Sequence, residues 1–288
     1  MKFNKLIAVA ALTFASAVAC ASDRITIIHT GGKTGFTAVL AKQYSDAFAE
    51  SYKNIEVIAP GGCIPVLSHL KNNTKDPIVV MWDTGNIPAE CKAEFSKQNA
   101  ASTMSVYFAL VTNNKNATIE DFIKGKGKIG IAPPFKFWTG FVNDIERSTG
   151  NKFEGILPVG DSGKQVLSLK SGEVDWVFLN GSRAYEQVEA GNFKAVASTD
   201  PKGQGDIPFV GARIKNFGTD VFLGWGVYIT NLDTADRAKF EETIRKLHET
   251  KNWKEFTKKF YLVDSTLNSP TKRNEIYRSN MNAMSTKD

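Results

Sequence analysis

The chain has 288 residues, of which 42% are hydrophobic and 23% are charged, an ordinary balance for a globular protein that can bury one large core or two medium ones. Its net charge of +6 is spread along the sequence, without an arginine-rich block or an aromatic platform motif. These properties argue against nucleic-acid binding and are compatible with a small anionic ligand.

The first 21 residues have the pattern of a secretory signal peptide. Two lysines precede an apolar run over residues 6–19, and Ala19-Cys20-Ala21 matches the small-x-small rule for cleavage. This run is too short for a stable membrane span. We therefore expect cleavage near Ala21 and an exported, soluble protein whose charge excess falls from +6 to +4. A lipoprotein alternative would acylate Cys20, although Ala17 stands where such sites usually carry leucine.

The first predicted strand, residues 24–29, ends in a turn that contains Gly32-Lys33-Thr34. This tripeptide closes the phosphate loop of nucleotide hydrolases, but that motif also needs a glycine at the position of Ile27. The spacing therefore excludes a phosphate loop. A helix is predicted over residues 35–51, because its apolar residues recur on one face. These residues are Phe36, Val39, Leu40, Tyr44 and Phe48.

The rest of the chain alternates short apolar runs with amphipathic segments. Strands are predicted over residues 55–59, 77–82, 104–112, 128–132, 155–159, 174–179, 193–197 and 219–230. Helices are predicted over residues 64–72, 118–124, 137–149, 162–170, 235–250 and 251–260. Strands separated by helices indicate an α/β protein with mainly parallel sheets and helices on both faces.

Two of these strands, residues 104–112 and 219–230, are expected to cross between two lobes. The strand–helix alternation begins again after the first of them, and the C-terminal helices follow the second. We expect residues 22–106 and 222–288 to form lobe 1 and residues 107–221 to form lobe 2, with a cleft between them. Ligands of such sheets bind at the carboxyl ends of the strands.

Three predicted strand-to-helix junctions are rich in glycine and small polar residues: residues 30–35 (TGGKTG), 60–62 (PGG) and 160–163 (GDSG). Glycine lets the backbone come close to a ligand, and the free N–H groups at a helix N-terminus favour an anion. Any one junction is equally compatible with a tight turn that binds nothing. Three of them, spread over both lobes, favour a shared anion site in the cleft.

Other candidate ligand contacts also follow predicted strands. Thr84 is a candidate hydrogen-bond donor after residues 77–82, and Asn180 and Ser182 follow residues 174–179. Phe135 and Trp138 lie near the start of the predicted helix of lobe 2, where they would either stack on a ligand or pack in the core.

Charged and aromatic residues near these junctions have competing interpretations. Asp161 is expected to cap the following helix with its side chain. Lys33 would either neutralise a second carboxylate or point into water. Trp176 and Trp225 lie in apolar strands and are interpreted as core or hinge residues.

Cleavage of the signal peptide would leave two cysteines, Cys63 and Cys91. A disulfide between them would stabilise the fold by about 3–4 kcal/mol in the chain-entropy model. The alternative is a pair of free buried thiols. We favour the disulfide, because free thiols are a liability in an exported protein.

The sequence does not favour catalysis or a metal cofactor. The three histidines, His29, His69 and His248, are scattered without the spacing of metal ligands, and no Gly-x-Ser-x-Gly motif occurs. His29 is expected to pack or to form a hydrogen bond at the surface of lobe 1. We therefore predict a non-enzyme without a cofactor.

The order of several segments along the chain is more informative about the protein's family than their composition. After the double glycine of the first junction come PGG, TIEDFIKGKGKIGIA at residues 118–132 and ILPVGDSGKQVLSLKSGEVDWVF at residues 156–178. The segment FVGARIKNFGTDVFLGWGVYIT follows at residues 209–230. This order resembles the substrate-binding proteins of tripartite tricarboxylate transporters over nearly the whole exported chain, and residues 160–178 are its most specific part.

The resemblance implies a type II periplasmic-binding-protein fold that closes on a small carboxylate. It implies a periplasmic, monomeric receptor that delivers its ligand to membrane transporter subunits. The backbone N–H groups that hold the ligand would be those of Thr30, Gly31, Gly32, Thr34 and Gly35 in lobe 1 and of Gly160, Asp161 and Ser162 in lobe 2.

The sequence departs from the family at the first junction, and other functions stay open. The family usually has a proline-rich entry and an early acidic residue, whereas this chain has His29-Thr30 and then Thr34-Gly35-Phe36. This difference bears on the ligand more than on the fold. The alternatives are an extracytoplasmic sensor subunit, a receptor for a phosphate or phosphonate anion and, least favoured, a hydrolase.

Overall fold

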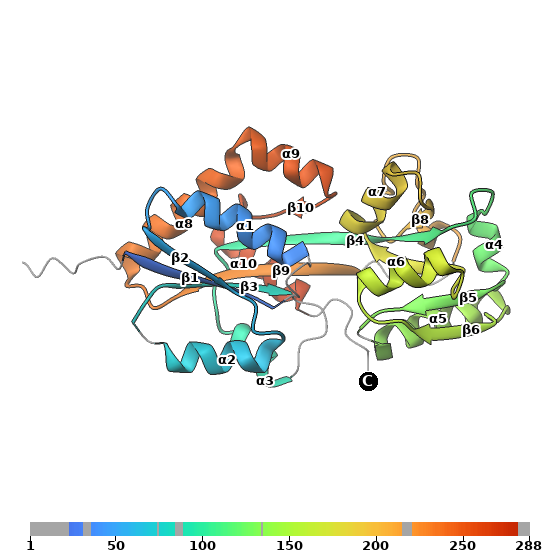
Figure 1. Ribbon diagram of the computed structural model, residues 1–288, viewed down its shortest axis with the longest axis horizontal. Helices are drawn as coiled ribbons and strands as arrows, with labels where there is room; N and C mark the ends of the chain where they lie inside the picture. Colours follow the sequence, from blue (N-terminus) through green and yellow to red (C-terminus); the bar gives the residue numbers. More distant parts are fainter. Residues whose placement is uncertain are drawn as a thin grey trace, which may run out of the picture.

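The computed structural model describes residues 23–30, 36–73, 75–83, 89–133, 135–214 and 221–281. Within these ranges the protein is an α/β structure with helices around an extended mixed sheet (Figure 1). The strands are β1 (Arg24–His29), β2 (Asn54–Ile58), β3 (Ile78–Asp83), β4 (Ser102–Thr112), β5 (Lys128–Ile131), β6 (Gly155–Pro158), β7 (Trp176–Asn180), β8 (Lys194–Ser198), β9 (Phe222–Thr230) and β10 (Val263–Asp264). The helices are α1 (Phe36–Phe48), α2 (Cys63–Asn72), α3 (Ala89–Phe95), α4 (Ile119–Ile123), α5 (Phe135–Thr149), α6 (Ser162–Ser171), α7 (Gly181–Glu189), α8 (Thr234–Glu249), α9 (Lys251–Lys259) and α10 (Pro270–Asn280).

The sheet has the strand order β2-β1-β3-β9-β4-β7-β5-β6, and β8 and β10 also pair with β4. Strand β1 is parallel to β2 and β3, and β5 is parallel to β6 and β7. Strands β4 and β9 are antiparallel to each other and to their other neighbours. A parallel group therefore lies at each end of the sheet, and two antiparallel strands join the groups.

Strand β4 contributes to both ends of the sheet. Its residues 102–107 pair with β9, whereas residues 108–111 pair with β7. The molecule is drawn out into two lobes: lobe 1 contains β1, β2, β3 and β9, and lobe 2 contains β5 to β8, on the left and right of Figure 1. The predicted two-lobed α/β fold is confirmed.

Each lobe buries its own hydrophobic core. In lobe 1, one core cluster forms around Tyr44 and Trp253 and a second one around Phe95. In lobe 2, one cluster contains Phe122 and another contains Leu169. Complete burial of one such apolar side chain stabilises a fold by roughly 1.5–3 kcal/mol. Two packed lobes are thus joined by β4 and β9.

Capping residues mark several helix ends, and one of them, Asp161, caps its helix as the sequence predicted. The Thr118 hydroxyl accepts a hydrogen bond from the Asp121 N–H, and the Asp121 carboxylate accepts one from the Thr118 N–H, so both residues form a capping box. The Asp161 carboxylate caps α6 by accepting a hydrogen bond from the Lys164 N–H at 3.0 Å. Gly172 ends α6 in the left-handed conformation, at a φ of 75°. Local sequence signals therefore set these helix ends.

Three helices, α3, α7 and α10, were not predicted, nor was the short strand β10. Helix α7 begins directly after β7 with Asn180 as its N-cap, so Ser182, predicted only to follow the strand, is already helical. Helix α10 is polar almost throughout, and only Tyr277 and Asn280 are buried along it. A polar sequence of this kind shows little of the apolar periodicity from which helices are predicted.

The surface position predicted for His29 is wrong. Its side chain is only 3% exposed, and its Nδ1 atom lies 3.5 Å from the Thr37 hydroxyl of α1. Residue 29 ends β1, a strand that has β2 on one side and β3 on the other, and α1 covers it. The central position of β1 in lobe 1 therefore buries the imidazole.

The predicted disulfide between Cys63 and Cys91 is confirmed. It links the first residue of α2 to α3, and both cysteines are buried. None of the helices in the described ranges combines the length and the apolar character that a membrane span requires.

Candidate functional site

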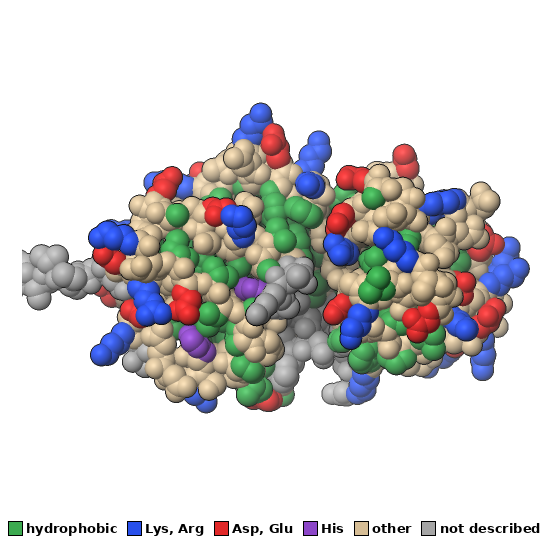
Figure 2. All heavy atoms as spheres, viewed as in Figure 1, with side chains coloured by type: hydrophobic (Ala, Val, Ile, Leu, Met, Phe, Trp, Pro, Cys, Tyr) green, Lys and Arg blue, Asp and Glu red, His purple; other side chains and the backbone are tan. Residues whose placement is uncertain are grey.

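A cavity of about 250 Å³ lies between the lobes. Figure 2 shows hydrophobic side chains along the groove between the lobes, with acidic and basic side chains beside it on lobe 2. Lobe 1 contributes Phe36, Val39 and Phe260 to the lining. Lobe 2 contributes Asp161, Ser162, Gly163, Asn180, Ser182, Arg183 and Glu186. Among the described residues, the cavity therefore has an apolar wall on lobe 1 and a polar wall on lobe 2.

The apolar wall belongs to an aromatic cluster. The ring of Phe36 lies 5.3 Å from that of Phe260 and 5.1 Å from that of Trp225, and it stacks on Phe256 with a centroid distance of 6.1 Å. These rings come from α1, α9 and β9, so the fold of lobe 1 holds them in place. Such a wall offers apolar contact area on fixed side chains.

The first part of the polar wall is the start of α6. Gly160 has a φ of 95°, a conformation that favours glycine, and it precedes the N-cap Asp161. One carboxylate oxygen of Asp161 is occupied by the cap. The hydroxyl of Ser162 has no hydrogen-bond partner within the described residues, so it is free to contact a ligand in the cavity.

The second part of the polar wall is the start of α7. The side-chain oxygen of Asn180 accepts hydrogen bonds from the Arg183 N–H at 3.1 Å and from the Ser182 hydroxyl at 2.9 Å. A Cβ atom at Gly181 would lie 2.9 Å from a methyl carbon of Val106 and 3.0 Å from the carbonyl oxygen of Tyr107, both in β4. The glycine thus lets α7 begin close against the shared strand.

Arg183 and Glu186 place opposite charges on the polar wall. They form an ion pair at 2.7 Å on neighbouring turns of α7, and their side chains are 43% and 54% exposed. An exposed pair of this kind contributes only about 0–1 kcal/mol to stability. Both side chains can therefore change partners when a ligand enters.

Four of the predicted ligand-binding residues line this cavity: Asp161, Ser162, Asn180 and Ser182. Gly160 lies next to them in the chain. The other described candidates, Thr30, Phe135 and Trp138, do not line the cavity.

Trp138 is only 2% exposed and packs against Phe178 in the core of lobe 2, which favours the core interpretation. Phe135 is 40% exposed at the start of α5 and is not part of the cavity lining. Thr30 links β3 to the start of α2, since its N–H donates to the Met81 carbonyl and its own carbonyl accepts from the Gly62 N–H. Five predicted ligand contacts lie outside the described residues: Gly31, Gly32, Thr34, Gly35 and Thr84.

Sequence reasoning missed Arg183, Glu186 and Phe260 as lining residues. The first two follow Asn180-Gly181-Ser182 directly, and a helix predicted from that point would have placed them near its N-terminus. The helix formers in residues 184–189 (AYEQVE) are the signal that was available. Nothing in the sequence indicates that the end of α9 faces α7, because that proximity arises from the packing of the lobes.

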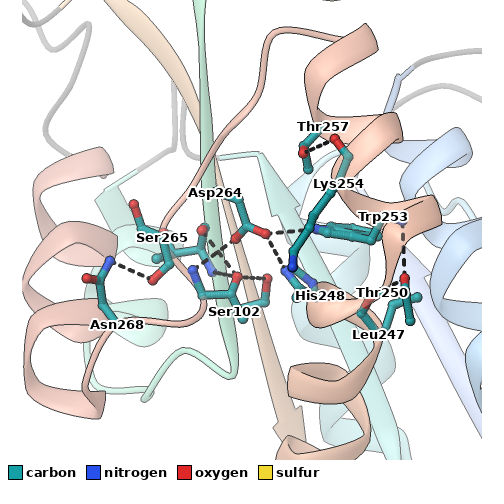
Figure 3. Close-up of polar contacts among 12 residues, drawn as sticks. Ser102, Leu247, His248, Thr250, Trp253, Lys254, Thr257, Asp264, Ser265 and Asn268 are labelled. Atoms are coloured by element: carbon teal, nitrogen blue, oxygen red, sulfur yellow. Dashed lines mark hydrogen bonds and ion pairs between the residues drawn. The ribbon is translucent and has the colours of Figure 1, made fainter.

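A second polar cluster lies inside lobe 1, away from the cavity (Figure 3). His248 contacts the Asp264 carboxylate through Nδ1 and the Tyr44 hydroxyl through Nε2, both at 2.7 Å. The Tyr44 hydroxyl donates to Ser102 at 2.8 Å. Ser102 and the His248 side chain are fully buried, so this serine–tyrosine–histidine–aspartate chain has no access to a substrate. We interpret it as a structural network.

Burial and hydrogen bonds shift the pKa values of Asp264 and Tyr44 in this network. Burial alone would raise the pKa of Asp264, but hydrogen bonds and the charge of His248, with further bonds from Thr266 and Trp253, lower it overall. Burial raises the pKa of Tyr44 well above its usual value, which keeps the phenol protonated. Among the described residues, no group of three or more histidine, cysteine or acidic side chains is placed to hold a metal ion.

No protein-family model matches the chain. No curated protein matches it either. Solved structures do match, although their sequence identity is low. The chain is similar to an R. palustris protein crystallised with adipate (TM-score 0.70, 13% identity, 90% of this chain and 94% of that one). It is also similar to the periplasmic binding protein BugD (TM-score 0.66, 12% identity, 91% and 93%).

A third similar structure is a TctC solute-binding protein from Polaromonas without ligand (TM-score 0.57, 14% identity, 90% and 97%). All three comparisons extend over nearly the full length of both chains. The chain thus has the fold of periplasmic solute-binding proteins of the TctC and BugD kind, as its segment order suggested.

Proposed function

We propose that the protein is a periplasmic receptor that binds a small carboxylate between its lobes and delivers it to a membrane transporter of the tripartite tricarboxylate type. The observation that carries this proposal is the interlobe cavity, whose polar wall presents the starts of α6 and α7 together with Arg183. Backbone N–H groups at helix starts and a guanidinium are both suited to carboxylate oxygens.

The lobes of this receptor are residues 22–106 with 222–288 and residues 107–221. The change of partners along β4, between residues 107 and 108, supports this division. In this arrangement the ligand lies beside the strands that join the lobes. Closure around it would exclude water and strengthen each charged contact.

The size and the surroundings of the cavity support a small anion. A volume of about 250 Å³ is slightly below the roughly 300–1,000 Å³ of typical small-molecule sites. Two lysines flank the cavity: the stem of Lys164 lies beside Gly160, and the Lys259 Nζ lies 5.5 Å from the centre of the Phe260 ring. Their charges would favour the approach of an anion.

The compared structures support the same class of ligand and a non-enzymatic role. Two of them are a solute-binding protein and a periplasmic binding protein, and the third holds adipate, a dicarboxylate. A signalling subunit with the same cavity is the second candidate function, because the cavity itself does not distinguish transport from sensing. A receptor for a phosphate or phosphonate anion differs from both in its ligand.

The proposal is tested by isothermal titration calorimetry of the purified protein against dicarboxylates, tricarboxylates, amino acids, aromatic acids and inorganic phosphate. At least one carboxylate should bind with a Kd of roughly micromolar. Native mass spectrometry of the protein as purified tests for a retained anion. Uptake of the identified ligand by a deletion strain separates transport from sensing, since only a transport receptor is needed for uptake. Absence of any carboxylate in both binding experiments contradicts the proposal.

A further inference from the structure

We infer that the cleft takes a carboxylate that also carries an ammonium group and an apolar side chain, which is the chemistry of an apolar α-amino acid. Arg183 would hold the carboxylate of this ligand and Glu186 its ammonium group. This inference rests on the proposed function, because it specifies which kind of carboxylate the same cavity binds.

The first observation is that the two opposite charges on the polar wall are neighbours. Arg183 and Glu186 both line the cavity, and their ion pair spans 2.7 Å on one face of α7. Because each side chain is about half exposed, their mutual attraction is weak in water. A ligand can therefore exchange the internal pair for two pairs of its own.

Glu186 loses its partner when Arg183 turns to the ligand. In a closed, water-poor cleft, a plain carboxylate on Arg183 leaves Glu186 unpaired beside a second negative charge. An unpaired charge in such surroundings is strongly unfavourable. An ammonium group on the ligand removes this conflict, since it donates hydrogen bonds to the Glu186 carboxylate while Arg183 binds the ligand carboxylate in its fork.

Asp161 does not supply a competing partner for Arg183. One of its oxygens accepts the Lys164 N–H and fixes the side chain at the start of α6. Its negative charge nevertheless adds to that of Glu186 on the same wall. The lining itself thus has two carboxylates and one guanidinium, while Lys164 and Lys259 lie beside it and do not line it, so the lining suits a ligand with a cation better than one with several carboxylates.

The opposite wall determines the rest of the ligand. Phe36, Val39 and Phe260 face the cavity from lobe 1 without a charged group among them. Against these three side chains, the lining that the described residues of lobe 1 provide, a second ligand carboxylate would lose its hydration without gaining a hydrogen bond. An aliphatic or aromatic side chain would instead gain contact with the rings.

The inference is tested by calorimetry with matched ligands. L-leucine and L-phenylalanine are compared with 4-methylpentanoate and 3-phenylpropionate, which lack the ammonium group, and with adipate. Each amino acid should bind at least about tenfold more tightly than its deaminated analogue. Glu186→Gln should abolish that preference by weakening only the amino acids, whereas Arg183→Gln should weaken every carboxylate about ten- to a hundredfold.

Glu242→Gln is the matched control, because Glu242 pairs with Arg245 at 2.7 Å in the same i,i+3 arrangement on α8, and it does not line the cavity. It should leave all affinities unchanged. Equal or tighter binding of the deaminated acids or of adipate by the unsubstituted protein overturns the inference but leaves the proposed function intact. Unchanged amino-acid affinity in Glu186→Gln also overturns it. If none of these ligands binds, the inference fails, and the proposed function fails as well only if no other carboxylate of the wider panel binds.

Discussion

Tyr185 of α7 stacks on Tyr261, which follows α9, with ring centroids 3.7 Å apart and ring planes at 29°. This aromatic contact therefore bridges the lobes directly beside the cavity. Glu186, which follows Tyr185, and Phe260, which precedes Tyr261, both line the cavity. Tyr261 holds a φ of 53°, which is uncommon for a residue with a side chain. The backbone is thus bent in a way that presents this ring to lobe 2.

We predict that loss of this stack makes the ligand-free protein more open. An aromatic pair is worth about 0.5–1.5 kcal/mol beyond its buried area, so Tyr261→Ala should raise the open population roughly two- to tenfold. Tyr261→Gly should open the protein equally and unfold less readily than Tyr261→Ala, because glycine adopts a positive φ without strain. Energy transfer between dyes on the two lobes reports the opening, and urea unfolding reports the stability.

Tyr52→Ala is the control for this experiment, since the Tyr52 ring contacts Phe48 and Phe240 within lobe 1 only. It should lower the free energy of unfolding and leave the distance between the lobes unchanged. An unchanged distance in both Tyr261 variants would show that the stack does not hold the lobes.

The disulfide between Cys63 and Cys91 should stabilise lobe 1 through the unfolded state. It spans 28 residues of sequence and joins α2 to α3, and a loop of this size is worth about 3–4 kcal/mol in the chain-entropy model. We expect reduction to lower the free energy of unfolding by this amount. The double substitution Cys63→Ala and Cys91→Ala should be destabilised similarly and no longer respond to reductant. A reductant effect that persists in this variant would contradict the assignment.

Gly226 of β9 lies directly beneath the ring of Tyr277 in α10. A Cβ atom built at Gly226 overlaps this ring, and Tyr277 is fully buried. Gly226→Ala should therefore reduce the free energy of unfolding by about 1–3 kcal/mol, as overpacking does in other cores. Gly140→Ala, at an exposed position in α5 with open space around it, should be neutral or stabilising by up to about 1 kcal/mol. If urea unfolding gave Gly226→Ala the same free energy of unfolding as the unsubstituted protein, the predicted clash with Tyr277 would be contradicted.

The sequence was informative wherever a local signal coincided with the end of an apolar strand. Asp161 and Asn180 were found because each follows such a strand and each has a residue type that caps helices. Arg183 and Phe260 were missed because a side chain's place in a cleft depends on how two lobes pack. Local periodicity carries no information about that packing.

The network of lobe 1 was hidden from sequence reasoning for a related reason. Tyr44 and His248 are 204 residues apart, and each lies on the buried face of its helix. Only the packing of α1 against α8 brings them together. The disulfide was predictable without geometry, because two cysteines in a protein expected to be exported to an oxidising compartment favour a disulfide.

Asp264 anchors this network by accepting three hydrogen bonds: from His248 and Trp253 on Oδ2 and from the Thr266 N–H on Oδ1. Both oxygens of this carboxylate therefore face hydrogen-bond donors, and an N–H group in place of either oxygen would have no acceptor. In Asp264→Asn, the amide group would meet an N–H on whichever side it faces. We expect this substitution to lower the free energy of unfolding by about 1–3 kcal/mol near neutral pH.

The pH dependence of that loss follows from the direction of the pKa shift. The folded protein holds the pKa of Asp264 below the 3.8 of an unperturbed aspartate, so the unfolded chain binds the proton more readily than the folded one. The stabilisation is therefore present above about pH 4 and is lost as the pH falls through the lowered folded pKa. Urea unfolding between about pH 7 and pH 3 measures the free energy of unfolding of the unsubstituted protein and of Asp264→Asn. The difference between these two free energies should narrow only at the acidic end.

The control is Asp46→Asn, which removes an exposed partner of Lys42 and should change the free energy of unfolding by no more than about 1 kcal/mol. A difference for Asp264→Asn that stays constant down to the lowest pH would mean that the carboxylate charge does not stabilise the network.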